Sequence, residues 1–292
     1  MAPAAAPPIE QVKLQSGSEA HKRAFCHMLL DTHDPYEPAL IDWPALSPDA
    51  LTRLTSLPIW NIAVQTECRA SINVASYAEI VDDLLLRKAI ELNAFEEARH
   101  KRLLAHMVAF YGIRLDPEPE YRAPRDREWA FMDTGFSECI DSFFAFGLFA
   151  LAKRSGFFPP SLVTAFEPVI QEECRHILFF VNWVAWQRRS LPLWRRTIFA
   201  ARVLALWIVQ IWDRIKIAKR LGGKADDNFT LTGSRAIAVD IAPRDLLDLC
   251  LAENERRMSA LDPRLKRPGI IPKLVRLVRP FLRSRVAPTV DA

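Results

Sequence analysis

Hydrophobic residues recur along this chain at the three- and four-residue spacing of amphipathic helices, and the strict alternation typical of strands is rare. The pattern predicts four long helices, at about 57–79, 82–112, 127–154 and 161–190, the last bent near Pro168. Gly112 and the pair Ser155-Gly156 are expected helix ends. A short helix near 21–30 and a proline-rich connection, 34–48, are expected earlier; later helices are expected at 193–221, 243–261 and 270–283. Residues 1–18 are expected to form a flexible tail, and 222–234 a polar linker.

Composition supports a large helical core. Half of the 292 residues are hydrophobic and only nine are glycine. The net charge of +4 is too small to indicate nucleic-acid binding. Five cysteines without a C-x-x-C pair favour a reducing, cytoplasmic setting. The first residues lack the features of a signal peptide, and polar residues interrupt the most apolar stretch, 198–212, so we predict no transmembrane segment.

A five-residue pattern, Glu-Glu-x-Arg-His, occurs at 96–100 and again at 172–176. In a helix, residues three apart lie on one face, so Glu97 and His100 can bind one metal ion together, as can Glu173 and His176. One further glutamate in or beside an apolar run precedes each motif. These two are Glu67 and Glu138.

Carboxylates and imidazoles suit iron or manganese, and burying six ionisable groups without metal would be prohibitive. A single Glu-x-x-His would be ordinary helix surface, but two copies with two further glutamates predict a dinuclear site. We expect two iron ions, with an iron–manganese pair left open. The predicted ligands are Glu67, Glu97, His100, Glu138, Glu173 and His176.

The first glutamate of each motif is expected to support the metal ligands from outside. Glu96 and Glu172 can accept the other ring N–H of the histidine on the opposite helix, and Arg99 and Arg175 can balance their charge. The alternative is a solvated helix face with local salt bridges. The histidines outside the two motifs are expected in surface or core roles: His21, His27, His33 and His106.

The ordered set of six ligands resembles the ferritin-like di-iron carboxylate superfamily, in particular its oxygen-activating members. The resemblance covers residues 57–190 and implies an all-α fold: a ferritin-like four-helix bundle with an N-terminal extension (1–56) and additional C-terminal helices in a basic, apolar extension (191–292). Leu104 stands where ribonucleotide reductase small subunits carry a radical tyrosine, so that relative is disfavoured. About a hundred residues after the fourth helix distinguish the chain from storage ferritins and bacterioferritins. The missing cysteine pairs argue against a rubrerythrin-type electron relay.

Acyl-carrier-protein desaturases, quinone hydroxylases, tRNA hydroxylases and bacterial multicomponent monooxygenases remain as relatives. In the last group a threonine lies beside the oxygen site, which makes Ser142 a candidate for proton delivery; the alternative is a helix serine bonded to its own backbone. Four phenylalanines follow Ser142 and either fill the core or line an apolar pocket. They are Phe143, Phe144, Phe146 and Phe149.

The C-terminal third is apolar, aromatic and basic. Residues 264–285 combine eight Lys or Arg residues and no acid with aliphatic residues at helical spacing. Such a helix suits the inner face of an anionic membrane better than nucleic acid. The alternative is that 193–221 packs on the bundle and the basic end is solvated.

Together these features predict an O2-dependent di-iron monooxygenase, hydroxylase or desaturase acting on an apolar, lipid-like substrate. No G-x-G-x-x-G fingerprint is present, so a separate reductase would supply electrons. A homodimer is compatible with this hypothesis. Two alternatives are an iron-handling or peroxide-reducing protein without organic substrate, and a membrane-bound interaction protein with structural metal.

Overall fold

Helices joined by short connections make up the fold. The computed structural model describes residues 14–219 and 241–283, and none of these residues lies in a strand. The predicted all-α class is therefore confirmed. The predicted linker at 222–234 and most of the N-terminal tail lie outside the described residues. In chain order the elements are α1 (Glu19–Asp31), η1 (Pro38–Leu40), α2 (Pro48–Ser56), α3 (Trp60–Ala78), α4 (Leu84–Phe110), α5 (Arg127–Ser155), α6 (Pro160–Thr164), α7 (Glu167–Ser190), α8 (Leu193–Lys219), α10 (Pro243–Ser259), α11 (Ile270–Val278) and η2 (Arg279–Phe281).

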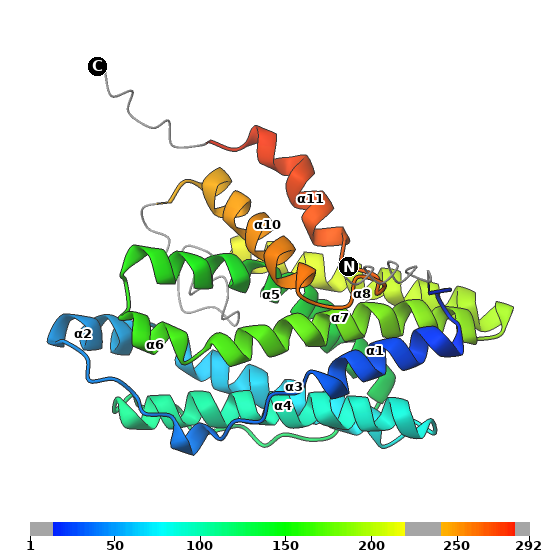
Figure 1. Cartoon of the computed structure of the whole chain (residues 1–292), viewed down its shortest axis with the longest axis horizontal. Coiled ribbons are helices and arrows are strands. Elements are labelled where there is room, and N and C mark those ends of the chain that lie inside the picture. Colours follow the sequence, from blue (N-terminus) through cyan, green and yellow to red (C-terminus); the bar gives the residue numbers. More distant parts are fainter. Residues whose placement is uncertain (1–13, 220–240, 284–292) are drawn as a thin grey trace, which may run out of the picture.

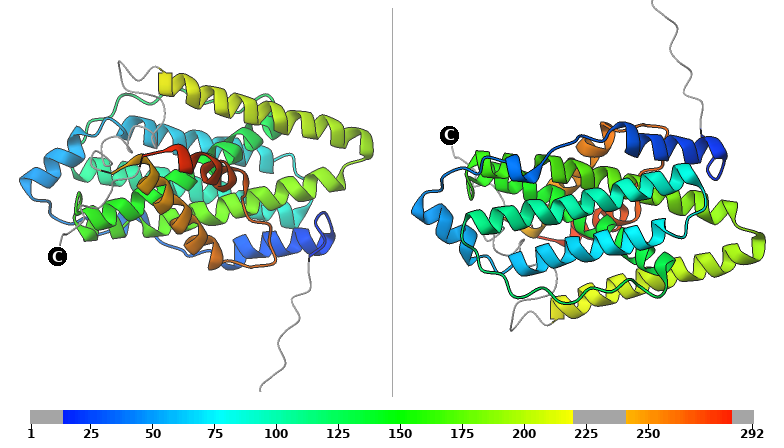
Figure 2. Two further views of the ribbon diagram at one scale, coloured as in Figure 1. Left: turned by 90° about the horizontal axis from the view of Figure 1, so that it is seen from above. Right: turned by 90° about the horizontal axis from the view of Figure 1, so that it is seen from below.

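Four long helices, α3, α4, α5 and α7, lie side by side and form the centre of the molecule (Figure 1). Helix α3 packs along α4 and against α5, and α7 contacts both α5 and α4. The N-terminal α1 covers α7 and α4, while α10 packs on α5 and α8 runs along one edge (Figure 2). The segments before and after the four helices therefore belong to the same packed body.

Local sequence signals place most helix ends. The side chains of Ser18, Asp83 and Asp126 accept backbone N–H groups at the starts of α1, α4 and α5. Gly112 and Gly156 follow the ends of α4 and α5 with positive φ angles of 66° and 64°, as predicted for helix-ending glycines.

Three predictions about the helices need correction. The single helix expected over 161–190 is two helices, because Pro168 stands in the first turn of α7, where its missing N–H costs nothing, and starts a helix instead of bending one. Helix α2 was not predicted, although Ser47 caps it and Pro48 occupies its first position. The last helix is shorter than expected and gives way to a 3₁₀ turn at Pro280.

Two hydrophobic clusters lie on either side of the middle of α4. One contains Ile90 and Ala94 and packs against α1, α5, α7 and α8; the other contains Leu103 and Met107 and packs against α2, α3 and α6. Glu97 and His100 lie on α4 between them and are buried. The fold thus surrounds its most polar interior segment with apolar side chains on both sides.

Helix α5 is long and apolar enough to cross a membrane by length and composition, and it is the one such helix among the described residues. Most of this apolar stretch is buried inside the protein, where it contacts α3, α7, α8 and α10. Its hydrophobicity is accounted for by its central place in the core.

Candidate metal centre

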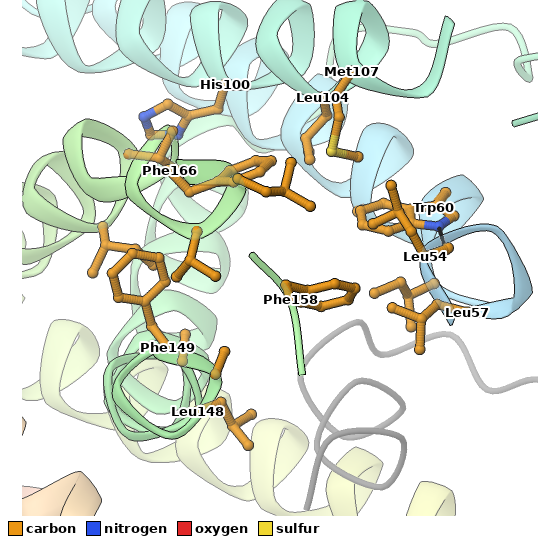
Figure 3. Close-up of a pocket in the computed structure, with 18 of the residues that line it drawn as sticks. Leu54, Leu57, Trp60, His100, Leu104, Met107, Leu148, Phe149, Phe158 and Phe166 are labelled. Atoms are coloured by element: carbon orange, nitrogen blue, oxygen red, sulfur yellow. Dashed lines mark hydrogen bonds between the residues drawn. The ribbon is translucent and has the colours of Figure 1, made fainter. Parts of the chain in front are cut away.

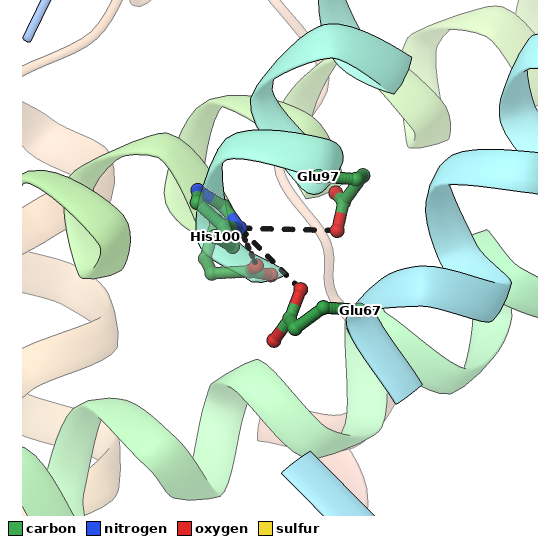
Figure 4. A group of neighbouring side chains, drawn as sticks. Glu67, Glu97 and His100 are labelled. Carbon is green, nitrogen blue, oxygen red and sulfur yellow. Dashed lines mark ion pairs between the residues drawn. The ribbon is translucent and has the colours of Figure 1, made fainter. Parts of the chain in front are cut away.

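The repeated motif brings side chains from three helices to one point. Glu67 of α3, Glu97 and His100 of α4, and Glu173 of α7 offer ligand atoms that all lie within 4.8 Å of one another (Figure 4). The Nδ1 atom of His100 lies 3.3 Å from a carboxylate oxygen of Glu173, 3.5 Å from one of Glu67 and 3.8 Å from one of Glu97. This group is the strongest candidate for binding a cation among the described residues.

The remaining two predicted ligands lie beside the same group. His176 of α7 has its Nδ1 atom 2.7 Å from Oε1 of Glu97, and the two imidazole ring centres are 5.7 Å apart. Glu138 of α5 lines the same polar pocket as Glu67, Glu97 and Glu173. The structure therefore gathers all six predicted residues at one place, from all four long helices.

Unpaired buried atoms indicate that the group fits a cation. Four of its polar atoms are buried without a hydrogen-bond partner: Oε1 of Glu97, Nδ1 of His100, Oε1 of Glu138 and Nδ1 of His176. Even the 2.7 Å approach of His176 to Glu97 lacks hydrogen-bond alignment. Neighbouring ligands about 2.1 Å from a shared octahedral cation lie roughly 3 Å apart, close to the separations here. Orphaned groups of this kind are costly unless an ion joins them.

A glutamate of the opposite helix binds each histidine at Nε2, the ring nitrogen that faces away from the cluster. Nε2 of His100 lies 2.8 Å from Glu172, and Nε2 of His176 lies 2.7 Å from Glu96. The carboxylate accepts a hydrogen bond from Nε2–H, which leaves Nδ1 facing the cluster as the ring nitrogen that can bind a metal ion. The predicted roles of Glu96 and Glu172 as partners of the opposite histidines are confirmed.

Both outer glutamates are neutralised by the arginines of the motifs. Arg99 bonds Glu172, and Nη1 of Arg175 donates to Glu96 at 3.1 Å. All four of these residues are at most 2% exposed. The first glutamate and the arginine of each motif thus form two buried, cross-helix ion pairs around the histidines, in place of the solvated helix face that was the alternative.

Residues of the N-terminal segment contact the outer glutamates and arginines from the outside. These contacts were not predicted from the sequence. Nδ1 of His33 lies 2.6 Å from Glu96, and Arg175 donates to Thr32 and to the Leu29 carbonyl. The Arg99 guanidinium stacks 4.0 Å from the centre of the Tyr36 ring. His33 was expected to have only a surface or core role, and its contact with Glu96 corrects that. A lone histidine in a loop carries no periodic signal that would have revealed this contact.

Burial and mutual repulsion set the protonation of the group. Burial raises the pKa of Glu67 to about 8 although His100 opposes it, and burial with the charges of Glu97 and Glu173 raises the pKa of Glu138 well above its usual range. Burial by itself would raise the pKa of Glu96, but the contacts with His176, Arg175 and His33 outweigh it and lower that pKa to about 2. Glu67 and Glu138 therefore hold protons that a cation would displace, while Glu96 stays ionised.

A polar pocket of about 310 Å³ opens on one side of the cluster. Its lining includes Glu67, Glu138, Glu173 and Ser142 and extends to Asp133 and Asp141 on α5. Ser142 is buried, and its hydroxyl donates to Glu173 at 3.0 Å. The hydroxyl predicted to deliver protons is thus in contact with a candidate ligand, not with its own backbone.

An apolar cavity of about 190 Å³ opens on another side (Figure 3). Glu67 and His100 are the only ionisable groups in its lining. The other lining residues are apolar and come from α2 to α7 and from the segments that join these helices. Leu104 and Phe149 line it, whereas Phe143, Phe144 and Phe146 pack elsewhere in the core. The cluster therefore lies between an apolar and a polar space.

No family model, no curated protein and no solved structure matches this chain. Its fold and site define it as an all-helical protein with a buried Glu/His group suited to a metal ion.

Proposed function

We propose that the protein is a ferritin-like di-iron oxidoreductase that uses dioxygen to hydroxylate or desaturate an apolar, lipid-like molecule. One observation carries this proposal: the Glu/His cluster borders directly on the apolar cavity, with Glu67 and His100 forming its polar end. A site that only stored or oxidised iron would not need such a cavity. Ligand sites are typically apolar cavities with a few convergent polar groups.

The metal ions would be held by the six residues that meet at the cluster. Their four carboxylates and two imidazoles match the preference of iron for oxygen and nitrogen ligands, and iron–manganese suits the same set. Two iron ions, when bound, would supply the redox chemistry with dioxygen that no side chain can perform. The predicted ligands are Glu67, Glu97, His100, Glu138, Glu173 and His176.

The other residues would prepare the site. Glu96 and Glu172 hold the imidazoles with Nδ1 inward, which removes the need to reorganise them when metal binds. The apolar cavity would orient the substrate and exclude water. Ser142 would pass protons from the polar pocket to Glu173, to which its hydroxyl already donates. Electrons would come from a separate reductase.

Metal analysis and product analysis test this proposal in sequence. Purified protein is loaded anaerobically with Fe(II), its iron content is measured, and the reduced form is exposed to oxygen with saturated fatty acids and their esters. We expect close to two irons per chain and oxidised lipid products. Less than one iron per chain would contradict the metal site itself.

A cavity variant separates the oxygenase from an iron-handling protein. Leu104→Phe narrows the apolar cavity beside His100 without removing a ligand. We expect iron binding to persist and lipid oxidation to fall at least about tenfold, because a misplaced substrate loses its reactive geometry. The matched control is Leu51→Phe, on the exposed side of α2. Oxygen consumption with iron turnover and no organic product would instead favour a ferroxidase or peroxidase.

A further inference from the structure

Exposed large apolar side chains concentrate on two C-terminal segments. Eight lie on α8 and five on the segment formed by α11 and η2, against six on all the other described residues together. Contiguous exposed apolar surface on a water-facing protein marks an interaction site more often than chance. These two segments are therefore the places to look for a partner.

The α11–η2 segment has two apolar faces. Pro272 and Val275 are buried, and Val275 belongs to a cluster with Phe143 and Cys250 that holds the helix on α5 and α10. The other face is exposed and repeats at helical spacing. It consists of Ile270 (49% exposed), Leu274 (44%), Leu277 (68%), Val278 (48%) and Phe281 (84%). Since the helix is already anchored by its first face, the second is not explained by the packing of this chain.

Charge distinguishes α11–η2 from α8. Lys273, Arg276 and Arg283 are exposed around the apolar row, and no acidic residue occurs from 263 to 283. Within the α11–η2 segment, Arg279 is paired with Asp248. On α8, by contrast, the cations nearest the exposed apolar residues between 204 and 212 each pair with an aspartate: Arg202, Arg214 and Lys216. Arg195 and Arg196 lie earlier on α8, beside the exposed Leu193 and Trp194. The apolar row of α11–η2 thus carries an unbalanced positive charge, and residues 204–212 of α8 carry little.

We propose that α11 and η2 dock the protein on an anionic lipid bilayer. An apolar row flanked by cations is the arrangement by which helices lie in the plane of a membrane, with the row reaching about 5–10 Å into the boundary between headgroups and acyl chains. The exposed Phe281 ring enters that boundary, while Lys273, Arg276 and Arg283 contact lipid phosphates. A second copy of the chain fits this surface less well, because two such segments would bring like charges together.

Vesicle flotation of the full-length protein tests the proposal. The vesicles are phosphatidylcholine alone, and phosphatidylcholine with about a third phosphatidylserine. We expect binding to the anionic vesicles only, weakened by salt. The double variant Lys273→Gln/Arg276→Gln should bind about 25-fold more weakly, near fivefold for each cation. Leu277→Ser/Phe281→Ser should bind at least about tenfold more weakly, because it removes the apolar anchor.

A matched control is available on α8. Leu204→Ser/Ile208→Ser also replaces two exposed apolar side chains and should leave vesicle binding unchanged. The proposal is overturned by absence of binding to anionic vesicles, by unaltered binding of the α11–η2 variants, or by loss of binding in the α8 variant alone. It is also overturned if Leu277→Ser/Phe281→Ser only dissociates a dimer in analytical ultracentrifugation, since a second copy would then cover this face. None of these outcomes depends on the metal chemistry.

Discussion

The two adjacent glutamates of each motif have different contacts although they are neighbours in sequence. Glu97 and Glu173 turn toward the cluster, whereas Glu96 and Glu172 turn toward the histidine of the opposite helix. Adjacent helical residues point about 100° apart, so one motif can supply both a ligand and a support. The cross-helix pairing also links metal affinity to the relative position of α4 and α7.

Replacing the supporting glutamates should weaken metal binding without removing a ligand. For Glu172→Gln and for Glu96→Gln we expect about 10–100-fold lower affinity for Mn(II), because the imidazole tautomer is no longer fixed and Arg99 or Arg175 loses its counter-charge. Competition titration with a chelating dye measures this affinity. Glu91→Gln, exposed on the same helix α4, should behave like the unmodified protein. Equal affinities in all forms would contradict the role assigned to the two glutamates.

Ser142 gives a test of proton delivery that leaves the metal in place. We expect Ser142→Ala to retain iron but to turn over at least about tenfold more slowly, since its hydroxyl donates to Glu173 at 3.0 Å. Ser142→Thr keeps the hydroxyl and should recover most of the rate. The measurement is product formation in H2O and in D2O. A rate in Ser142→Ala that matches the unmodified protein would show that the hydroxyl only packs.

At the scale of elements, close approach of helices depends on residues without side chains. A Cβ atom added at Gly147 of α5 would lie 2.3 Å from Sγ and 2.9 Å from Cα of Cys250 on α10. At Gly135 it would lie 2.3 Å from the Phe180 ring. The close packing of α10 on α5 therefore requires glycine at position 147, because the backbone atoms of Cys250 cannot move aside as a flexible side chain can.

Gly147→Ala should loosen α10 selectively. We expect a loss of about 1–3 kcal/mol in the free energy of unfolding, as for other overpacked sites, together with faster amide hydrogen exchange in α10. Urea unfolding and exchange mass spectrometry provide the two measurements. In the control, Gly269→Ala, the nearest atoms to the new Cβ are 3.9 Å away, so it should cost less than about 1 kcal/mol. Unchanged exchange in α10 would contradict the packing argument.

At the scale of the whole molecule, the buried cluster is shared by the four long helices, because each of them contributes at least one of its residues. Without a cation Glu67 and Glu138 keep protons, and the pKa of Glu67 rises to about 8 because of its burial. A folded-state pKa above the usual value means that Glu67 destabilises the metal-free fold increasingly as pH rises from about 4.5 toward 8. A cation reverses this effect by taking the place of the protons.

Metal binding should therefore stabilise the protein more at high pH. A cation at about 100 times its Kd adds about 2.7 kcal/mol, and its affinity should rise about tenfold per pH unit for each proton released, up to about pH 8. Differential scanning fluorimetry with and without Mn(II), at pH 6 and pH 8, measures the change in Tm. Glu67→Gln should reduce both the gain and its pH dependence. The same gain at both pH values would rule out this linkage.

The sequence by itself determined the helical class, the approximate span of the long helices and the candidate ligands that meet in the Glu/His cluster, because helix periodicity, capping residues and i,i+3 pairs are local. It also indicated the cross-helix roles of Glu96 and Glu172. The tertiary structure decided what depends on packing between distant segments. It split the expected fourth helix at Pro168 and added α2, brought His33 and Tyr36 to the supporting arginines and glutamates, and placed Phe149, alone of the four phenylalanines that follow Ser142, beside the apolar cavity. These contacts join residues far apart in the chain, so no local pattern encodes them.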